Sequence, residues 1–144
     1  MTVASDLYFL DSNIWLYALL KKVQLTPDDL TKAQVSNRLI DSPNVAVSTQ
    51  VINEVSVNLI KKARFTESQI QSLIQSFYDG CQVIAPSQSL LIQASQVRDR
   101  YSLSFWDGLI IAAALTANVG TLYSEDMQNG LVVFDQLAIV NPFS

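Results

Sequence analysis

The side chains in this chain that can do chemistry are almost all carboxylates. The sequence holds 13 Asp and Glu residues, a single cysteine, Cys81, and no histidine. This composition excludes Ser-His-Asp and Cys-His nucleophile systems, a histidine general base, zinc sites with histidine or cysteine ligands alone, and an intramolecular disulfide. If the protein does chemistry at a metal, the ligands are oxygen atoms, which favour hard cations such as Mg²⁺ or Mn²⁺.

Two acidic residues follow segments that have the pattern of strands. Asp11 ends a four-residue apolar run, and Asp126 lies shortly after a second predicted strand. Each also has a purely structural interpretation, because Asp is a frequent helix N-cap and a common turn residue. Chain position does not choose firmly between Asp126 and its neighbour Glu125, although alternation places Ser124 and Asp126 on one side of an extended chain.

Two further acids lie on predicted helices. Asp107 opens a helix with almost no polar face, which is typical of a buried helix, and a buried lone carboxylate is costly unless it is paired, capped or bound to a metal. A capping box with Ser104 explains Asp107 locally and is compatible with a role at a site. Glu54 lies at the border of an apolar helix face, where a solvated helix acid is the preferred interpretation from local sequence.

The elements that must position these acids alternate between short apolar runs and helical periodicity. Strands are predicted over 7–10, 45–47, 82–85, 121–123 and 137–140, whereas 131–134 is either a core strand or a subunit contact. Helices are predicted over 13–20, 27–41, from Ser48 or Thr49 through Leu59, from Thr66 through Phe77, over 87–98, and over 104–118 with Gly120 closing the last one. This order predicts an α/β fold, a three-layer α/β/α sandwich around a mostly parallel five-stranded sheet.

Sites in parallel sheets form beyond the carboxyl ends of the strands, where the strand order reverses. A parallel sheet could therefore gather the two acids that follow strands and the two on adjoining helices at one rim. Carboxylates packed that closely repel one another and demand cations. One or two Mg²⁺ or Mn²⁺ ions would orient a water, lower its pKa and stabilise charge on a phosphoryl oxygen, chemistry that suits phosphodiester hydrolysis without histidine.

Length and charge narrow the class of protein. The 144 residues fit a single domain, 1–144, that can bury a substantial core. The net charge of −4 argues against a protein held to nucleic acid by bulk positive charge alone. No apolar run reaches the roughly 18 residues that a membrane span needs, so a soluble intracellular protein without membrane contact is expected.

Several basic and aromatic side chains could contact a nucleic acid. The candidate phosphate ligands are Lys21 with Lys22, Lys61 with Lys62 and Arg64, and Arg98 with Arg100, although a solvated face or helix end is preferred for each group. Three aromatic residues could stack on unpaired bases, but their apolar neighbours favour a place in the core: Trp15, Tyr17 and Trp106. Cys81 is expected to be a small buried hydrophobe.

Four short motifs lie along the chain: Leu10-Asp11-Ser12-Asn13, Ser48–Glu54, Tyr101–Asp107 with Leu109–Ala114 after it, and Leu122-Tyr123-Ser124-Glu125-Asp126. They resemble the motifs of the PIN-domain nucleases, in particular the VapC-like toxins of bacterial toxin–antitoxin pairs, in the family's order and over nearly the whole chain. The third motif is the most specific of the set. The mild departure is Gly108, where an alanine is more usual.

The resemblance implies a PIN-like fold and a cytoplasmic, Mg²⁺- or Mn²⁺-dependent endoribonuclease that cleaves single-stranded or structured RNA. It assigns metal binding and water activation to Asp11, Glu54, Asp107 and Asp126, and thereby favours Asp126 over Glu125. Asn13 and Ser124 would support these ligands through hydrogen bonds. Toxin members of the family are commonly homodimers that are inhibited by a small cognate antitoxin protein.

Other functions fit the sequence less well. A catalytically silent PIN-like module that binds RNA or protein is the main alternative, and the complete set of acids argues against it. A nucleotide-binding domain would need a glycine-rich phosphate loop, and no two of the four glycines are close together. A phosphatase of the doubly wound class normally has a second Asp two residues after the first, where this chain has Asn13.

Overall fold

A mostly parallel sheet of six strands forms the centre of the molecule. The computed structural model describes residues 6–20 and 26–144, and the strands in it follow the order β3-β2-β1-β4-β6-β5. All neighbouring strands are parallel except β5 and β6. The strands are β1 (Tyr8–Leu10), β2 (Val45–Ser48), β3 (Gln82–Ile84), β4 (Thr121–Tyr123), β5 (Val132–Val133) and β6 (Leu137–Val140).

The predicted sheet is confirmed, with one addition. Five strands were expected, and all five are present at nearly the expected residues. The sixth, β5, lies in the segment 131–134 that the pattern left open, and it pairs antiparallel with β6 at the edge of the sheet. The two residues of β5 are too few for alternating hydrophobicity to predict a strand. The strand forms because β6 supplies its hydrogen-bond partners.

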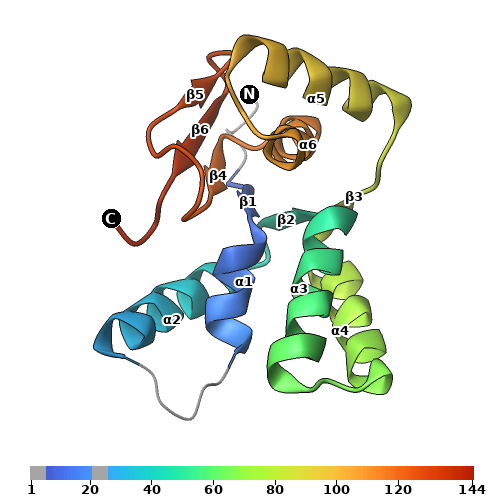
Figure 1. Cartoon of the computed structure of the whole chain (residues 1–144), viewed down its shortest axis with the longest axis vertical. Coiled ribbons are helices and arrows are strands. Elements are labelled where there is room, and N and C mark those ends of the chain that lie inside the picture. The colour runs from blue at the N-terminus through green and yellow to red at the C-terminus, as the bar shows by residue number, and fades with distance from the viewer. Residues whose placement is uncertain (1–5, 21–25) are drawn as a thin grey trace.

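Helices cover both faces of the sheet, as the three-layer prediction requires. In Figure 1, α1 to α4 lie on one side of the strands and α5 with α6 on the other. The closest helix pairs are α5 with α6 and α1 with its neighbours α2 and α3. The helices are α1 (Ser12–Leu19), α2 (Pro27–Ile40), α3 (Thr49–Ala63), α4 (Glu67–Gly80), α5 (Gln88–Arg100) and α6 (Phe105–Thr116).

Each helix begins at a side chain that caps it. In every case the capping oxygen accepts a hydrogen bond from a backbone N–H of the first turn, which stabilises a helix by about 1 kcal/mol. The capping box predicted between Thr66 and Gln69 is present in full. The caps are Asp11, Thr26, Ser48, Thr66, Ser87 and Ser104.

Helix α6 is the most apolar helix and forms the centre of its layer. Its residues from Ile110 to Ala114 are buried, as its apolar sequence predicted. The prediction that Gly120 closes this helix is wrong, because the left-handed residue after it is Asn118, with φ 59°. Asn tolerates this conformation through its short polar side chain. In the described parts of the chain, no helix combines the length and apolarity needed to cross a bilayer.

The strand order reverses beside β1. The chain fills the sheet from β1 through β2 to β3 at one edge, and then returns to place β4 on the other side of β1. Leu10 and Tyr123, the last residues of β1 and β4, are paired. Asp11 and Ser124 therefore leave adjacent strands at the switch point, where open α/β sheets bind ligands.

Gly108 makes room for an arginine from the neighbouring helix. A Cβ atom on Gly108 would lie 2.6 Å from the Arg98 Cγ and 3.1 Å from its Cδ. The Arg98 guanidinium donates a hydrogen bond to the Phe105 carbonyl oxygen at 3.2 Å and lies 4.2 Å from the Phe105 ring centroid. The departure at Gly108 from the more usual alanine thus has a steric cause.

We expect the effect of Gly108→Ala to depend on Arg98. Alanine favours a helix interior over glycine by about 1 kcal/mol, but here its Cβ must displace the arginine stem. In an Arg98→Ala background, Gly108→Ala should therefore stabilise the protein by about 1 kcal/mol, whereas in the wild type it should gain less or destabilise. Urea unfolding of the four proteins in this double-mutant cycle measures the difference. Equal effects in both backgrounds would contradict the steric explanation.

Candidate active site

Asp11 is the most buried carboxylate at the switch point. Its residue is 7% exposed. One carboxylate oxygen accepts a hydrogen bond from the Ser12 backbone N–H at 2.8 Å, and the other accepts one from the Ser124 hydroxyl at 2.8 Å. Burial raises the pKa of Asp11 to about 6, the two hydrogen bonds oppose the rise, and the negative charges of Glu54 and Asp107 add to it. The N-cap interpretation of Asp11 is correct, and the residue also faces other acids.

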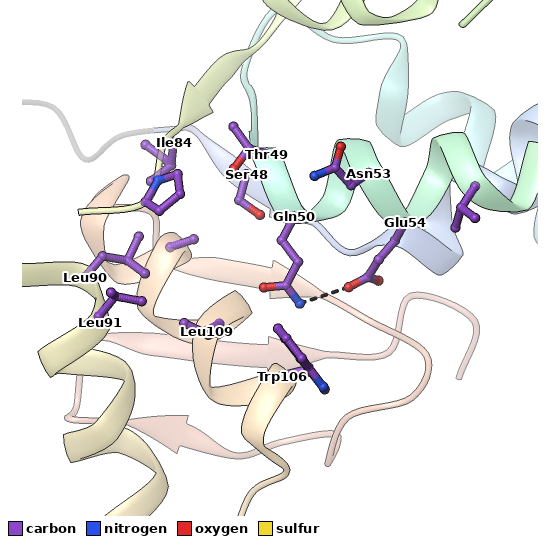
Figure 2. A pocket seen from close by; sticks show the side chains of 13 residues that line it. Ser48, Thr49, Gln50, Asn53, Glu54, Ile84, Leu90, Leu91, Trp106 and Leu109 are labelled. Atoms are coloured by element: carbon purple, nitrogen blue, oxygen red, sulfur yellow. Dashed lines mark hydrogen bonds between the residues drawn. The ribbon is translucent and has the colours of Figure 1, made fainter. Parts of the chain in front are cut away.

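Glu54 is tied to the start of α1. Its carboxylate accepts hydrogen bonds from the Ser12 hydroxyl at 2.8 Å and from the Gln50 side-chain amide at 2.9 Å (Figure 2). The side chain is half-buried, so the preferred local interpretation, a solvated helix acid, is wrong. The reason is tertiary, because the partner hydroxyl comes from a segment 42 residues earlier in the chain.

Asp107 lies in the first turn of α6. Its backbone N–H donates a hydrogen bond to the Ser104 hydroxyl at 3.1 Å, which confirms the predicted cap. Its pKa is raised, first by burial and then by the negative charges of Asp126 and Glu54, while the Ser104 side chain opposes the rise. The cap and a place among the other acids are therefore compatible.

The loop after β4 separates the roles of Asp126 and Glu125. Asp126 accepts a hydrogen bond from the Asn13 side-chain amide at 3.2 Å. Glu125 instead accepts a hydrogen bond from the Tyr17 hydroxyl at 2.6 Å and pairs with the Lys32 ammonium at 2.6 Å. Asp126, and not Glu125, is among the charges that raise the pKa of Asp107.

Asn13 and Ser124 connect the acids to the backbone. The Asn13 side chain accepts a hydrogen bond from the Glu125 backbone N–H at 3.2 Å while its amide donates to Asp126. The fully buried Ser124 hydroxyl donates to Asp11 and accepts from the Asp126 backbone N–H at 3.3 Å. Both residues therefore orient carboxylates, as expected of supporting residues. Ser12 and Gln50 do the same for Glu54 and were not singled out from the sequence, although Ser12 lies inside the first motif.

The four acids form a cluster that no base in residues 6–20 and 26–144 neutralises through an ion pair. Among the described residues, both ion pairs involve Lys32, with Asp28 and with Glu125, and neither reaches the cluster. In the same part of the chain, no group of three or more acidic or cysteine side chains is arranged to hold a metal ion as it stands. Glu54 and Asp126 instead point carboxylate oxygens at protein hydrogen-bond donors. The cluster residues are Asp11, Glu54, Asp107 and Asp126.

The candidate cations lie on helix ends, as the preferred interpretation held. Lys61 and Lys62 lie in the last turn of α3, and Arg98 and Arg100 lie in the last turn of α5. Positive charges there interact favourably with the negative end of the helix dipole. Arg98 differs in that it also contacts Phe105. Lys21 and Lys22 lie outside the described residues.

The aromatic candidates divide between core and surface. Trp15 is 7% exposed and contacts the Phe77 ring, as predicted. Tyr17 is only half-buried because its hydroxyl binds Glu125. The prediction that Trp106 lies in the core is wrong, since 62% of this residue is exposed. Cys81 is half-buried, and burial raises the pKa of its thiol to about 11, which keeps it protonated and unreactive.

A cavity of about 690 Å³ lies beside the acid cluster, between α3, α5 and α6. Its polar side includes Gln50, Asn53 and Glu54, which project from α3 (Figure 2). The facing wall is apolar and ends at Trp106 on α6, and it also includes Ile84, Pro86, Leu90, Leu91 and Leu109.

Comparisons with known proteins agree with this fold. Among solved structures, a toxin–antitoxin complex from Klebsiella pneumoniae has a TM-score of 0.66 and 19% identity, covering 94% of this chain and 97% of that one. VapC20 of Mycobacterium tuberculosis, described as a sarcin-ricin loop cleaving toxin, has a TM-score of 0.61 and 18% identity over 83% of this chain and 91% of that one.

A third structure, VapBC2 from Rickettsia felis bound to a DNA fragment from its promoter, has a TM-score of 0.60 and 20% identity, covering 92% of this chain and 96% of that one. At these identities the likeness shows a common fold. No curated protein sequence matches the chain significantly. The model of one family, described as the PIN domain, matches residues 8–130, a range that contains all four acids of the cluster. The chain therefore belongs to the PIN-domain family.

Proposed function

We propose that this protein is a divalent-metal-dependent endoribonuclease that hydrolyses phosphodiester bonds in single-stranded or structured RNA. The observation that carries the proposal is the cluster of Asp11, Glu54, Asp107 and Asp126, in which burial and then neighbouring negative charges raise the pKa of Asp11 and of Asp107, and none of the four acids has an ion-pair partner among the described residues. A cation is the natural counter-charge for such a cluster.

The donor set fits a hard cation. All four side chains offer carboxylate oxygens, the ligands that Mg²⁺ and Mn²⁺ prefer. Asp11 is held by two hydrogen bonds and provides a fixed ligand, whereas Glu54 and the exposed Asp126 can turn from Ser12 and Asn13 toward an ion. When bound, Mg²⁺ or Mn²⁺ supplies an activated water and stabilises negative charge on a phosphoryl oxygen.

The protein's own groups then have distinct tasks. Ser124 holds Asp11 in one orientation, and Asn13 restrains Asp126 through a hydrogen bond. The first turn of α6 presents Asp107 at a positive helix end, which favours its ionised form. In this proposal the four carboxylates serve one metal site, and no histidine is needed.

We further propose that the protein acts in the cytoplasm as the toxin of a type II toxin–antitoxin pair, as a homodimer restrained by a small antitoxin. The similar structures described as a toxin–antitoxin complex, a sarcin-ricin loop cleaving toxin and VapBC2 bound to promoter DNA support this role. The alternative is a PIN-like module that binds RNA or protein without cleaving it, and the experiments below separate the two.

The purified protein should cleave RNA with Mg²⁺ or Mn²⁺, and chelator should abolish the cleavage. Asp107→Asn and Asp126→Asn should each lower the rate by at least about a hundredfold, because they remove charge that holds the metal. Two matched controls should keep most of the activity: Glu125→Gln, since Gln can still accept the Tyr17 hydrogen bond, and Asp99→Asn on the exposed surface of α5. Gel analysis of labelled RNA pools measures the rates.

Absence of cleavage by the wild type, freed of any partner, would support the binding-module alternative. Cleavage that persists in Asp107→Asn would place the activity elsewhere or in a contaminant.

The toxin role predicts a growth phenotype. Expression of the wild type alone should arrest bacterial growth, whereas Asp107→Asn, expressed at the same level, should not. Co-expression of the neighbouring reading frame should restore growth, because an antitoxin would block the site. Growth curves and colony counts measure this, and normal growth with active wild type would mean that the nuclease has another task.

The acid cluster also predicts a pH-dependent stability of the metal-free protein. Burial raises the pKa of Asp11 from its ordinary value of 3.8 to about 6. The folded state therefore binds this proton more tightly, and the contribution of Asp11 to stability is most favourable below about pH 4 and is lost as pH rises through 6. The loss at neutral pH is on the order of 3 kcal/mol at most.

Asp11→Asn should remove this penalty, because Asn does not ionise and still accepts the Ser12 N–H and donates to Ser124. In chelator at pH 7.5, the variant should be more stable than the wild type by about 1 to 3 kcal/mol, and the difference should shrink at pH 4.5. Urea unfolding at both pH values measures it. A difference independent of pH would show that Asp11 carries no such penalty.

A further inference from the structure

Two large aromatic side chains remain exposed at the start of an otherwise buried helix. Phe105 is 56% and Trp106 is 62% exposed, whereas the residues from Ile110 to Ala114 in the same helix are buried. Leaving two apolar side chains of this size exposed to water is unfavourable. The exposure of both rings at the start of α6 therefore requires an explanation.

The pair is held in place. The Phe105 and Trp106 rings contact each other edge to face, with centroids 5.1 Å apart. On its other side the Phe105 ring receives the Arg98 guanidinium at 4.2 Å. Trp106 is thus supported by a neighbour that is itself fixed, and it presents a flat surface with little conformational freedom to lose on binding.

This surface adjoins the acid cluster. Trp106 directly precedes Asp107 and lines the cavity that Glu54, Gln50 and Asn53 border from α3 (Figure 2). Gln50 donates one amide hydrogen to Glu54, which fixes its amide plane near the cavity. Because amide side chains carry both hydrogen-bond donors and acceptors, Gln50 and Asn53 can form hydrogen bonds with the edge of a planar heterocycle.

The charge of the cavity selects the part of a nucleic acid that fits it. Among the described residues that line it, Glu54 is the single charged one, and no lysine or arginine is present. A phosphate would be repelled there, whereas a neutral base offers a face for stacking and an edge for hydrogen bonds. Stacking on aromatic side chains is also the usual way in which proteins bind unpaired bases.

We infer that Trp106 is a stacking platform for one unpaired base of the RNA substrate, next to the bond that is cut, and that Gln50 and Asn53 contact the edge of that base. The inference rests on the proposed ribonuclease function and specifies its substrate contact. It assigns to Trp106 a binding role, distinct from the hydrolytic role of the acids.

Kinetics test the platform directly. Trp106→Ala should raise KM for a single-stranded RNA by about tenfold and change kcat less than KM, whereas Trp106→Phe should restore most of the loss. Tyr78→Ala serves as a matched control, because Tyr78 is an aromatic residue on α4 that is 55% exposed and does not line the cavity. An unchanged KM in Trp106→Ala, with an active wild type, would overturn the inference, whereas an inactive wild type would instead contradict the proposed function.

Fluorescence provides a second measurement that does not depend on cleavage. The chain has two tryptophans, and the Nε1 of the buried Trp15 has no hydrogen-bond partner in the described structure, so Trp15→Phe should be tolerated and leave Trp106 as the reporter. In an Asp11→Asn background with Mg²⁺, a single-stranded RNA should quench Trp106, and the same RNA annealed to its complement should quench it much less.

Two results of this titration would overturn the stacking role. Equal quenching by single-stranded and duplex RNA would show contact without an unpaired base. Alternatively, light scattering that shows a dimer for the wild type and a monomer for Trp106→Ala, together with no quenching by RNA, would assign this surface to contact between copies of the chain.

Discussion

The burial of Asp11 after β1, beside the negative charges of Glu54 and Asp107, is the constraint on which the rest of this site depends. Asp11 is buried beside other acids, so its ionised form is disfavoured by both desolvation and charge. Fixed dipoles partly offset this cost. The first N–H of α1 and the Ser124 hydroxyl favour a negative charge on Asp11, and the start of α6 favours one on Asp107. These groups restrain the cluster without neutralising it, which leaves room for a cation to do so.

The same constraint explains the neighbouring ion pair. Lys32 is the one described cation that makes ion pairs, and it is held by Glu125 and Asp28, outside the cluster. Glu125 also binds the Tyr17 hydroxyl, so the loop after β4 is anchored to α1 and α2. The Glu125 backbone N–H donates a hydrogen bond to the Asn13 side chain, whose amide in turn donates one to Asp126. The Lys32 ammonium therefore stabilises the loop that carries Asp126 without forming an ion pair with any of the four clustered acids.

Most of the fold was predictable, because it depends on local rules that the sequence obeys. Capping residues such as Thr66 and Ser104 mark helix starts, and the acid after β1 follows from the switch point. The exposure of Trp106 was not predictable, because it begins an apolar helix whose residues from Ile110 to Ala114 are buried by contacts with other elements. The ties of Glu54 to Ser12 and of Gly108 to Arg98 likewise join residues from different elements, and no local pattern encodes them.

The excess of acidic over basic residues affects how the chain would bind RNA. Four of its 13 acids form the cluster, and two divalent ions there would change the net charge from −4 to −4 + 4 = 0. Neutralisation at that point would remove much of the long-range repulsion toward a phosphate backbone. The cavity beside it offers an uncharged aromatic surface and amides instead of cations. Under the proposed function, affinity for RNA would then arise from metal ions at the scissile phosphate and from base contacts beside it, and a net positive charge would not be needed.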